Sequence, residues 1–378
     1  MKVCIITIVD YKNYGNRLQN CALNKALESL GIEVVNGLDF FSKSEWMMAK
    51  EKHGGSTFFI KKIPIRVIKV WHCLREKMAR NNRKYAGRMK KLREFTELNM
   101  ITFPYLYVKD NEDLKRKLDD QTIDYYIVGS DQVWNPYYEG HNFEFLDFTD
   151  SKKKLSFSAS FGVTDLPDDC KERYVRSLET FRNLSVREKT GKKIIEDLMN
   201  RDCHVSVDPT LLLPRCEWEN MIKEQNWERY TGDYIVTYFL GEVPQKILKS
   251  ASLNRMKMYC LNDENDVALF GEGVETFLYL IKNAKYVLTD SFHATVFAIV
   301  FNTDFYVFNR TQKGESNMFT RLDSLLELFD LTDRVYGDVN IEQMCSITEE
   351  KWEKVNRVLD DKRTEEMGYL SKILFEKI

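Results

Sequence analysis

A histidine stands where the sequence changes from an expected buried strand to an expected buried helix. The stretch Thr289-Asp290-Ser291-Phe292-His293 is polar, whereas residues 286–288 and 294–301 are apolar. This pattern predicts that His293 lies in or beside the first turn of the helix, with Asp290 or Ser291 as its cap, at the carboxyl end of a strand. Ligands bind at that edge of open parallel sheets. The helix dipole disfavours the imidazolium, so we expect a neutral His293; the alternative is a buried histidine bonded to backbone.

Two other places set polar residues beside an expected strand or helix end. Gly15 and Asn16 precede a helix N-terminus, where free N–H groups suit a phosphate or a sugar hydroxyl. Asp131 and Trp134 follow a short apolar strand, and a carboxylate beside a Trp face is a reasonable sugar subsite. The alternatives are that Gly15 only allows the turn to form and that Trp134 belongs to the core.

Apolar strands alternate with amphipathic helices along most of the chain, which predicts an α/β protein with mostly parallel sheets. A length of 378 residues favours two domains, and a Pro-bracketed segment near residue 207 marks a boundary. We therefore expect two Rossmann-like domains, residues 1–206 and 207–345, facing each other across a cleft. One or two terminal helices are expected over residues 346–378, and an arrangement in which they cross back to the first domain is one option.

Some expected elements have sharper limits. Strands are predicted at residues 3–9, 33–35, 125–128, 155–159, 184–186 and 234–239, and helices at residues 17–30, 172–182, 192–199 and 352–375.

Composition excludes several classes of protein. A net charge of −2 gives no excess charge that would favour nucleic acid, and no apolar run reaches the roughly 20 residues of a membrane span. The first apolar stretch is too short for a signal peptide. The eight cysteines include no CxxC pair, which argues against structural zinc, and free thiols fit a reducing compartment. We therefore expect a cytoplasmic protein that binds neither nucleic acid nor metal.

Residues 61–93, within an insert expected over about 58–95, carry many Lys and Arg against one acidic residue, Glu76. Val67, Val70, Trp71 and Leu74 recur at helical spacing among them. The pattern predicts an amphipathic basic helix that can lie on an anionic membrane surface. The alternative is a solvated helix packed on its own domain.

Four stretches at these relative positions together resemble the polysaccharide pyruvyl transferase family. They are "YKNYGNRLQNCAL" (11–23), "YYIVGSDQVWNP" (125–136), "LSVREKTGKKIIEDL" (184–198) with "VSVDPTLLL" (205–213), and "VLTDSFHATVFAIVFNTDF" (287–305). The resemblance spans most of the chain, apart from the basic segment and the terminal helices. It implies a fold similar to two-domain GT-B glycosyltransferases. It also implies transfer of the pyruvyl unit of phosphoenolpyruvate onto two sugar hydroxyls, leaving a ketal and phosphate, with no metal or redox cofactor.

The resemblance assigns catalytic roles to residues that match its motifs. His293 matches the family histidine and is expected to deliver a proton to the methylene carbon of the donor. Arg187, in "SVRE", matches the family arginine and is expected to hold the donor's phosphate and carboxylate. A surface ion pair of Arg187 with Glu188 or another neighbour is the alternative.

The same resemblance implies further donor contacts from the second domain. Lys313 resembles a basic residue that the family places in the loop after the last strand, Arg310 and Arg321 compete for the same role, and Ser291 is also expected beside the donor. Part of the family carries an arginine where this chain has Ser291, so one phosphate contact is missing. Either Arg187, Arg310 and Lys313 compensate, or this branch uses another phosphorylated donor.

The first domain is expected to hold the acceptor through Gly15, Asn16, Asp131 and Trp134, with Asp131 favoured over Trp134. The resemblance implies an acceptor glycan on a lipid carrier, made for capsule, exopolysaccharide or cell-wall polymer. This would bring a cytoplasmic enzyme to the inner membrane leaflet. Two other functions compete. One is a nucleotide-sugar glycosyltransferase, for which Glu315 is the candidate ribose contact, and the other is a noncatalytic scaffold for polysaccharide assembly.

Overall fold

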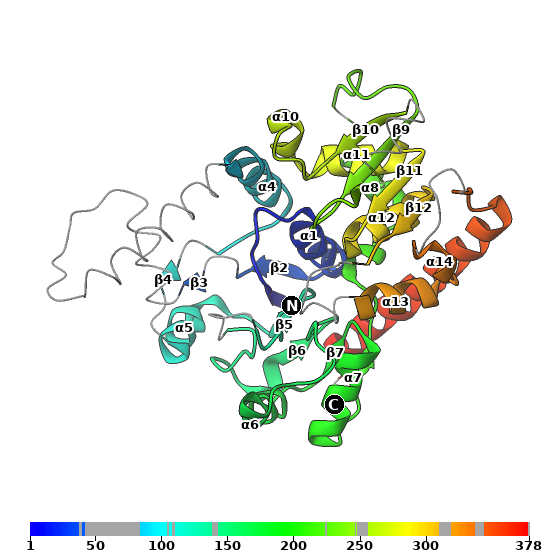
Figure 1. The fold of residues 1–378 in the computed structure, drawn as a ribbon. Helices are drawn as coiled ribbons and strands as arrows, with labels where there is room; N and C mark the ends of the chain where they lie inside the picture. Colours follow the sequence, from blue (N-terminus) through cyan, green and yellow to red (C-terminus); the bar gives the residue numbers. More distant parts are fainter. Residues whose placement is uncertain are drawn as a thin grey trace, which may run out of the picture.

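The structure is a computed structural model that describes most of the chain. The described residues are 1–37, 40–41, 84–103, 106–107, 110–137, 143–223, 225–245, 247, 256–309, 319–336 and 344–376. Strands and helices alternate along them (Figure 1). The first half contains β1 (Lys2–Ile6), α1 (Tyr14–Ser29), β2 (Glu33–Asn36), β3 (Phe40–Phe41), α4 (Ala86–Asn99), β4 (Leu106–Tyr107), α5 (Asn111–Leu118), β5 (Tyr125–Val128), β6 (Lys154–Ser156), α6 (Asp168–Leu178), β7 (Ser185–Val186), α7 (Lys189–Met199) and β8 (His204–Val205). The second half contains α8 (Arg215–Asn220), β9 (Tyr234–Tyr238), β10 (Lys257–Cys260), α10 (Val267–Phe270), α11 (Val274–Asn283), β11 (Tyr286–Thr289), α12 (Phe292–Phe301), β12 (Phe305–Val307), α13 (Phe319–Leu328) and α14 (Glu349–Phe375).

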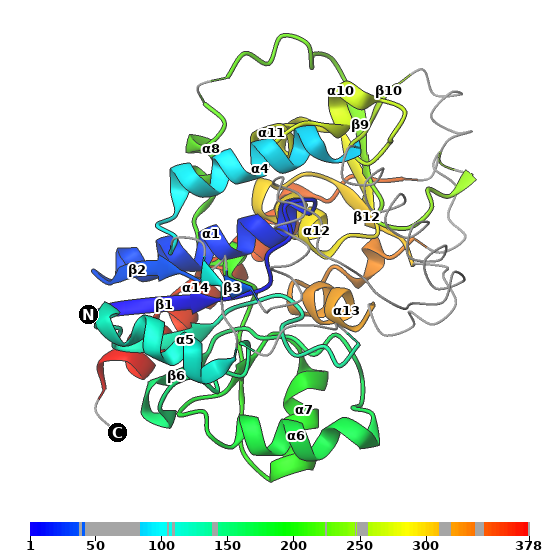
Figure 2. The same cartoon turned by 90° about the vertical axis from the view of Figure 1, so that its left-hand side faces the viewer.

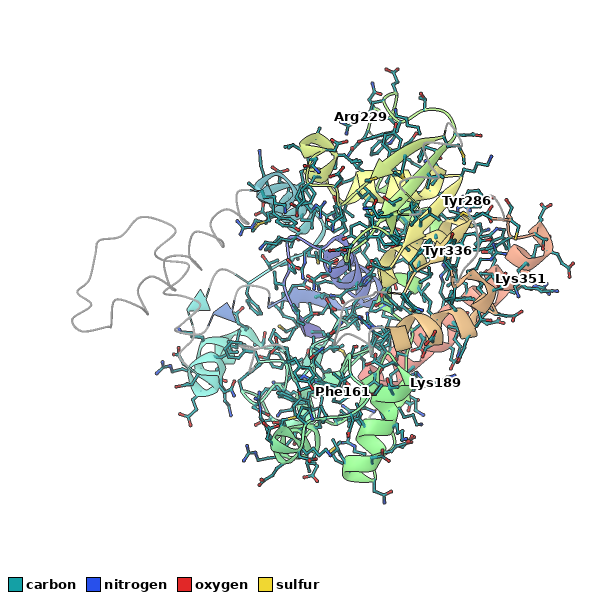
Figure 3. All side chains as sticks on the ribbon, in the orientation of Figure 1. Phe161, Lys189, Arg229, Tyr286, Tyr336 and Lys351 are labelled. Carbon is teal, nitrogen blue, oxygen red and sulfur yellow. The ribbon has the colours of Figure 1, made fainter. Side chains whose placement is uncertain are left out.

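Each half is built on a parallel sheet of four strands. The strand orders are β2-β1-β5-β6 and β10-β9-β11-β12, and every pairing in both sheets is parallel. Their central strands are buried on both faces, as in sheets covered by helices on either side. Phe161 lies in the first half, and Tyr286 and Tyr336 lie in the second (Figure 3). The prediction of an α/β fold with two Rossmann-like units is confirmed.

Several elements begin or end at residues that differ from the predicted ones. Helix α1 begins at Tyr14 instead of residue 17, so Gly15 and Asn16 lie inside its first turn. Strand β6 ends at Ser156 instead of residue 159. Ser158 has a φ of 57°, a left-handed conformation that cannot continue a strand. The terminal segment forms one helix, α14.

Helices α1 and α4 pack into the core of the second half, although both precede it in sequence. Tyr14 of α1 and Phe95 of α4 share one hydrophobic core with Phe277 of α11 and Phe297 of α12. Figures 1 and 2 both show α4 between α1 and the α10–α11 side of the second sheet. Burial of these aromatic rings holds the two halves together, because each ring removes a large apolar area from water.

The C-terminal part of the basic segment belongs to α4, a helix that buries one face against the second half. Arg88 of α4 is buried and donates hydrogen bonds to the carbonyl oxygens of Phe270 (2.9 Å) and Leu261 (2.7 Å). Its guanidinium also lies 4.5 Å from the Tyr14 ring centroid. Arg88 and Leu92 of this stretch are therefore buried against the protein, while Lys90 and Arg93 stay exposed, and contact of the basic segment with a membrane remains a prediction. Residues 61–83 lie outside the described part of the chain.

The terminal helix returns to the first half of the molecule. Glu366 of α14 is buried, with each carboxylate oxygen 3.2 Å from Nε2 of His204. Tyr369 stacks on the His204 ring at a centroid distance of 3.9 Å. Helix α14 thus crosses back to the first half, which is the option that the sequence left open. Within the described residues, no helix is both long and apolar enough to cross a membrane.

Candidate active site

His293 is the second residue of α12, directly after strand β11. Ser291 occupies the cap position, but its hydroxyl makes no capping hydrogen bond. The carboxylate of Asp290 instead accepts hydrogen bonds from the backbone N–H groups of Leu240 (2.7 Å) and Gly241 (2.9 Å). The predicted position of His293 in the first helical turn is confirmed. The prediction that the Asp290 or Ser291 side chain caps α12 is wrong, since Asp290 ties the loop after β9 to this site.

The first turn of α1 lies directly against the His293 ring. A Cβ atom added to Gly15 would lie 2.1 Å from Nδ1 of His293, so no side chain fits at position 15 while the imidazole keeps this place. The N-termini of α1 and α12 therefore meet at one point. Free backbone N–H groups and the two helix dipoles favour negative charge there.

Arg187, directly after β7, ends in a buried polar cluster. Its Nη1 donates to Oδ2 of Asp208 at 2.5 Å and to Oγ of Ser130 at 3.1 Å. Nε2 of His293 lies 3.7 Å from the same Asp208 oxygen. Arg187 and His293 are 6% and 7% exposed. The structure thus brings Arg187 and His293 together, because both groups approach a single carboxylate oxygen.

Glu188 does not pair with Arg187, although the two are neighbours in sequence. Its Oε1 accepts hydrogen bonds from Ser160 Oγ (3.0 Å) and from the backbone N–H of Phe161 (2.9 Å). The alternative of an Arg187–Glu188 ion pair is therefore wrong. The carboxylate of Glu188 fixes the loop after β6 instead.

The electrostatics of the cluster hold Asp208 ionised and His293 neutral. Burial would raise the pKa of Asp208, but the charge of His293 when it is protonated, the Arg187 guanidinium and hydrogen bonds from Thr210 lower it, so Asp208 stays ionised. Burial is the largest influence on His293 and lowers its pKa, and Arg187 and Arg321 lower it further, against the opposing charges of Asp208 and Asp131. The free site therefore contains a fixed carboxylate, fixed guanidinium groups and an unprotonated imidazole.

Asp131 and Asn16 lie beside this cluster on the side of the first sheet. Nδ2 of Asn16 donates to Oδ2 of Asp131 at 2.7 Å. Asp131 has a φ of 82°, a conformation that costs free energy in a residue with a side chain. Burial would raise the pKa of Asp131, but Arg187, His293, the Asn16 hydrogen bond and Arg321 lower it. A carboxylate is thus held in a strained conformation within the electrostatic reach of Arg187 and His293.

The other predicted site residues have different outcomes. Trp134 is fully buried and donates from Nε1 to the carbonyl oxygen of Glu144 at 3.1 Å, which corrects the prediction of a Trp sugar platform. Arg321 is buried, with its guanidinium carbon 5.9 Å from the Phe292 ring centroid. The remaining candidates, Lys313, Arg310 and Glu315, lie outside the described residues.

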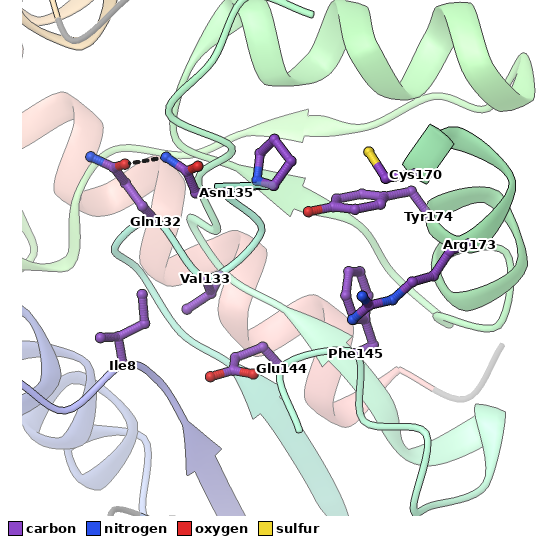
Figure 4. A pocket seen from close by; sticks show the side chains of 10 residues that line it. Ile8, Gln132, Val133, Asn135, Glu144, Phe145, Cys170, Arg173 and Tyr174 are labelled. Carbon is purple, nitrogen blue, oxygen red and sulfur yellow. Dashed lines mark hydrogen bonds between the residues drawn. The ribbon is translucent and has the colours of Figure 1, made fainter. Parts of the chain in front are cut away.

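A small pocket opens in the first half and is lined by residues that follow β5, Gln132 and Val133 among them (Figure 4). Gln132 and Asn135 face each other on one side of it, with Asn135 Nδ2 donating to Gln132 Oε1 at 2.6 Å. The residues lining the pocket combine amide, charged and apolar groups: Ile8, Gln132, Val133, Asn135, Pro136, Glu144, Phe145, Cys170, Arg173 and Tyr174. Such a mixture suits a polar ligand with an apolar face.

Sequence reasoning missed three members of the cluster, namely Asp208, Ser130 and Phe292. The Phe292 ring centroid lies 4.7 Å from the guanidinium carbon of Arg187. A signal was present for the two polar residues. Both lie just beyond the carboxyl end of a strand, which is the criterion that selected Asp131.

Comparisons with known proteins agree with this arrangement. The model of the polysaccharide pyruvyl transferase family matches residues 13–312. A search of curated proteins gives no match. Among solved structures, S. aureus MnaA in a co-structure with UDP is 10% identical, with a TM-score of 0.51 over 100% of this chain and 98% of that chain. A putative UDP-N-acetylglucosamine 2-epimerase from Listeria monocytogenes is 9% identical, with a TM-score of 0.49 over the same shares. The likeness to MnaA supports a GT-B-like fold.

Proposed function

We infer the function from the family, since this chain belongs to the polysaccharide pyruvyl transferase family. We propose that it transfers the pyruvyl unit of phosphoenolpyruvate onto two hydroxyls of a sugar. One observation carries the choice of donor. Within the described residues, Nε and Nη2 of buried Arg187 have no hydrogen-bond partner. These two nitrogens share one edge of the guanidinium, which matches two oxygens of a phosphate or carboxylate. A bound anion would satisfy both donors, which are costly to leave unpaired.

The surroundings of this edge favour an anion with more than one charged group. The N-termini of α1 and α12 meet beside it, as the contact between Gly15 and His293 requires. Arg321 is buried near the same Phe292 ring. Phosphoenolpyruvate carries a phosphate and a carboxylate on adjacent groups, so it can use both the guanidinium edge and the helix ends.

The proposed reaction assigns one step to each group. Protonated His293 delivers a proton to the methylene carbon of the donor, and the adjacent carbon becomes an oxocarbenium that one sugar hydroxyl attacks. The bond from this carbon to the phosphate oxygen breaks, and the second hydroxyl closes the ketal. One hydroxyl proton returns to His293 and the other leaves with the phosphate, whose charge Arg187 stabilises. Asp131, held by Asn16, is proposed to orient the sugar hydroxyls.

Acceptor-dependent release of phosphate tests this function. The protein is incubated with phosphoenolpyruvate and a panel of sugars, and the ketal methyl group is followed by NMR. Thermal shift with phosphoenolpyruvate and with nucleotide sugars separates the competing functions. Stabilisation by nucleotide sugars alone would indicate a glycosyltransferase, and stabilisation by neither ligand would favour a noncatalytic scaffold.

A lipid-linked glycan is the proposed acceptor, in the assembly of capsule, exopolysaccharide or cell-wall polymer at the inner membrane leaflet. The Lys and Arg residues of the segment 61–93 are the proposed membrane contact, with the exception of Arg88, which is buried against the second half. Sedimentation with anionic vesicles at low and high salt tests this contact, with Lys62, Arg66, Lys69 and Arg75 changed to Glu for comparison. Equal pelleting of both proteins would exclude it.

A further inference from the structure

Asp208 links the groups of the site through both of its carboxylate oxygens. It follows β8 in the sequence Asp208-Pro209-Thr210 and is 1% exposed. Oδ1 accepts from the backbone N–H of Thr210 at 3.0 Å and from its hydroxyl at 2.6 Å. Oδ2 accepts from Arg187 Nη1 at 2.5 Å and from Ser130 Oγ at 2.9 Å. Four hydrogen bonds therefore fix the carboxylate.

This arrangement determines which edge of Arg187 is open. Nη1 is used by Asp208 and Ser130, and the Phe292 ring covers a face of the guanidinium at 4.7 Å. The remaining edge, Nε with Nη2, has no partner among the described residues. A guanidinium that could rotate freely would offer any of its edges to an anion. The hydrogen bond to Asp208 leaves only the edge formed by Nε and Nη2 for an anion.

The same oxygen of Asp208 also lies near the imidazole. Nε2 of His293 is 3.7 Å from Oδ2, which is too long for a hydrogen bond, and Nε2 has no other partner in the described part of the chain. Gly15 blocks movement of the ring away on the Nδ1 side. His293 is therefore held beside the Arg187 edge with its buried Nε2 unpaired among the described residues.

We propose that Asp208 is a positioning residue for the transfer, which orients Arg187 and His293 around the donor at the expense of affinity for its phosphate. This inference rests on the proposed function. The negative charge of Asp208 partly neutralises Arg187, so phosphate binds more weakly than it would to an uncompensated buried guanidinium. Weaker binding also favours release of the phosphate product.

Asp208→Asn separates these two effects, because it removes the charge but keeps the shape. Inorganic phosphate should bind at least about fivefold more tightly by calorimetry, since a buried cation then lacks its counterion. At the same time kcat with phosphoenolpyruvate should fall about tenfold or more, because the guanidinium edge and the imidazole are no longer aligned. A purely structural role would weaken phosphate binding together with turnover. That result would overturn the inference.

Asp147→Asn is the matched control. Oδ1 of Asp147 accepts from Nζ of buried Lys154 at 3.0 Å, so the substitution also leaves a buried cation without its carboxylate, but outside the site. We expect a loss of thermal stability with less than a twofold change in phosphate affinity and in kcat. If Asp147→Asn reproduced the tighter phosphate binding, the effect would not belong to Asp208.

Ser130→Ala keeps the test valid if Asp208→Asn fails to fold. The serine hydroxyl bridges Arg187 Nη1 and Asp208 Oδ2 without contributing charge. We expect kcat to fall severalfold while phosphate affinity changes less than twofold. Unchanged kcat would contradict the inference.

The calorimetric comparison also separates the inference from the proposed function. Phosphate binding requires neither the sugar nor phosphoenolpyruvate. If the wild-type protein binds phosphate but never releases it from phosphoenolpyruvate, the proposed reaction fails. If turnover is observed and Asp208→Asn binds phosphate no more tightly, only the inference fails.

Discussion

Gly15 and His293 touch across the two halves of the molecule, with the imidazole occupying the space where a Cβ of residue 15 would stand, 2.1 Å from Nδ1. Gly15 belongs to the first turn of α1 and His293 to the first turn of α12. The contact places two helix N-termini at one point and gives His293 a fixed wall. The need for glycine at position 15 therefore comes from a close approach, because Gly15 lies in an ordinary helical turn.

Gly15→Ala should displace the imidazole. The added methyl group overlaps the ring, so we expect kcat to fall by about 10²-fold, as a shift of about 1 Å at a catalytic group can produce. Overpacking should also cost about 1–3 kcal/mol of stability. Gly368→Ala is the control, since no atom lies within 4 Å of a Cβ at that position of α14. Steady-state kinetics and thermal unfolding measure both effects. Normal turnover in Gly15→Ala would show that His293 does not need this position.

Arg187→Lys should weaken donor binding although the charge is kept. Lysine cannot present two parallel N–H groups, so we expect KM for the donor to rise about tenfold or more. Arg176→Lys, on the exposed face of α6, is the matched control and should bind the donor normally. Initial rates at varied phosphoenolpyruvate concentration give the comparison. Equal KM values for the two variants would remove Arg187 from the donor site.

Anion binding should draw a proton onto His293. Burial is the main cause that lowers the pKa of His293. Four charged groups also face the imidazole: Arg187, Arg321, Asp208 and Asp131. A bound dianion favours the imidazolium and raises this pKa, so protons are taken up on binding and affinity increases as pH falls through the raised pKa. The acid required for the reaction then forms when the donor is bound.

Sulfate is a suitable probe for this proton, because it does not itself titrate near neutral pH. Calorimetry of sulfate binding in buffers of different ionisation enthalpy measures the proton uptake. We expect uptake by the wild-type protein and none by His293→Gln, which should still bind sulfate and should lose about 10²-fold or more in turnover. The same uptake in both proteins would assign the proton to another group.

Arg88→Met should loosen the junction between the halves. The substitution keeps an apolar stem but leaves the carbonyl oxygens of Phe270 and Leu261 without their buried donor. Each unpaired group costs about 1–3 kcal/mol, so Tm should fall by about 5 °C or more. Lys90→Met, at an exposed position of the same helix, should leave Tm nearly unchanged. Similar Tm values for both variants would mean that Arg88 does not brace the junction.

The amino-acid sequence by itself determined the elements and the edge of the sheets where the site lies. Apolar residues that repeat every 3.6 positions indicate a helix, and those that repeat every 2 positions indicate a strand. In both cases the repeat arises because one face of the element is buried. The position of His293 in the first turn after a strand was found in this way, whereas Arg187 and the catalytic roles of both residues came from the family resemblance. Their chemistry needs only residue type and that local position.

Only the tertiary structure decided which side chains pair and which are buried. Arg187 bonds Asp208, 21 residues away, and not its neighbour Glu188. The sequence left open whether Trp134 forms a sugar subsite or belongs to the core, and it placed Arg88 on a basic helix, but both side chains are buried. The physical reason is that a side chain's environment depends on the elements packed over it. Contacts such as Gly15 with His293 arise when distant helices meet, and no local period in the sequence encodes that meeting.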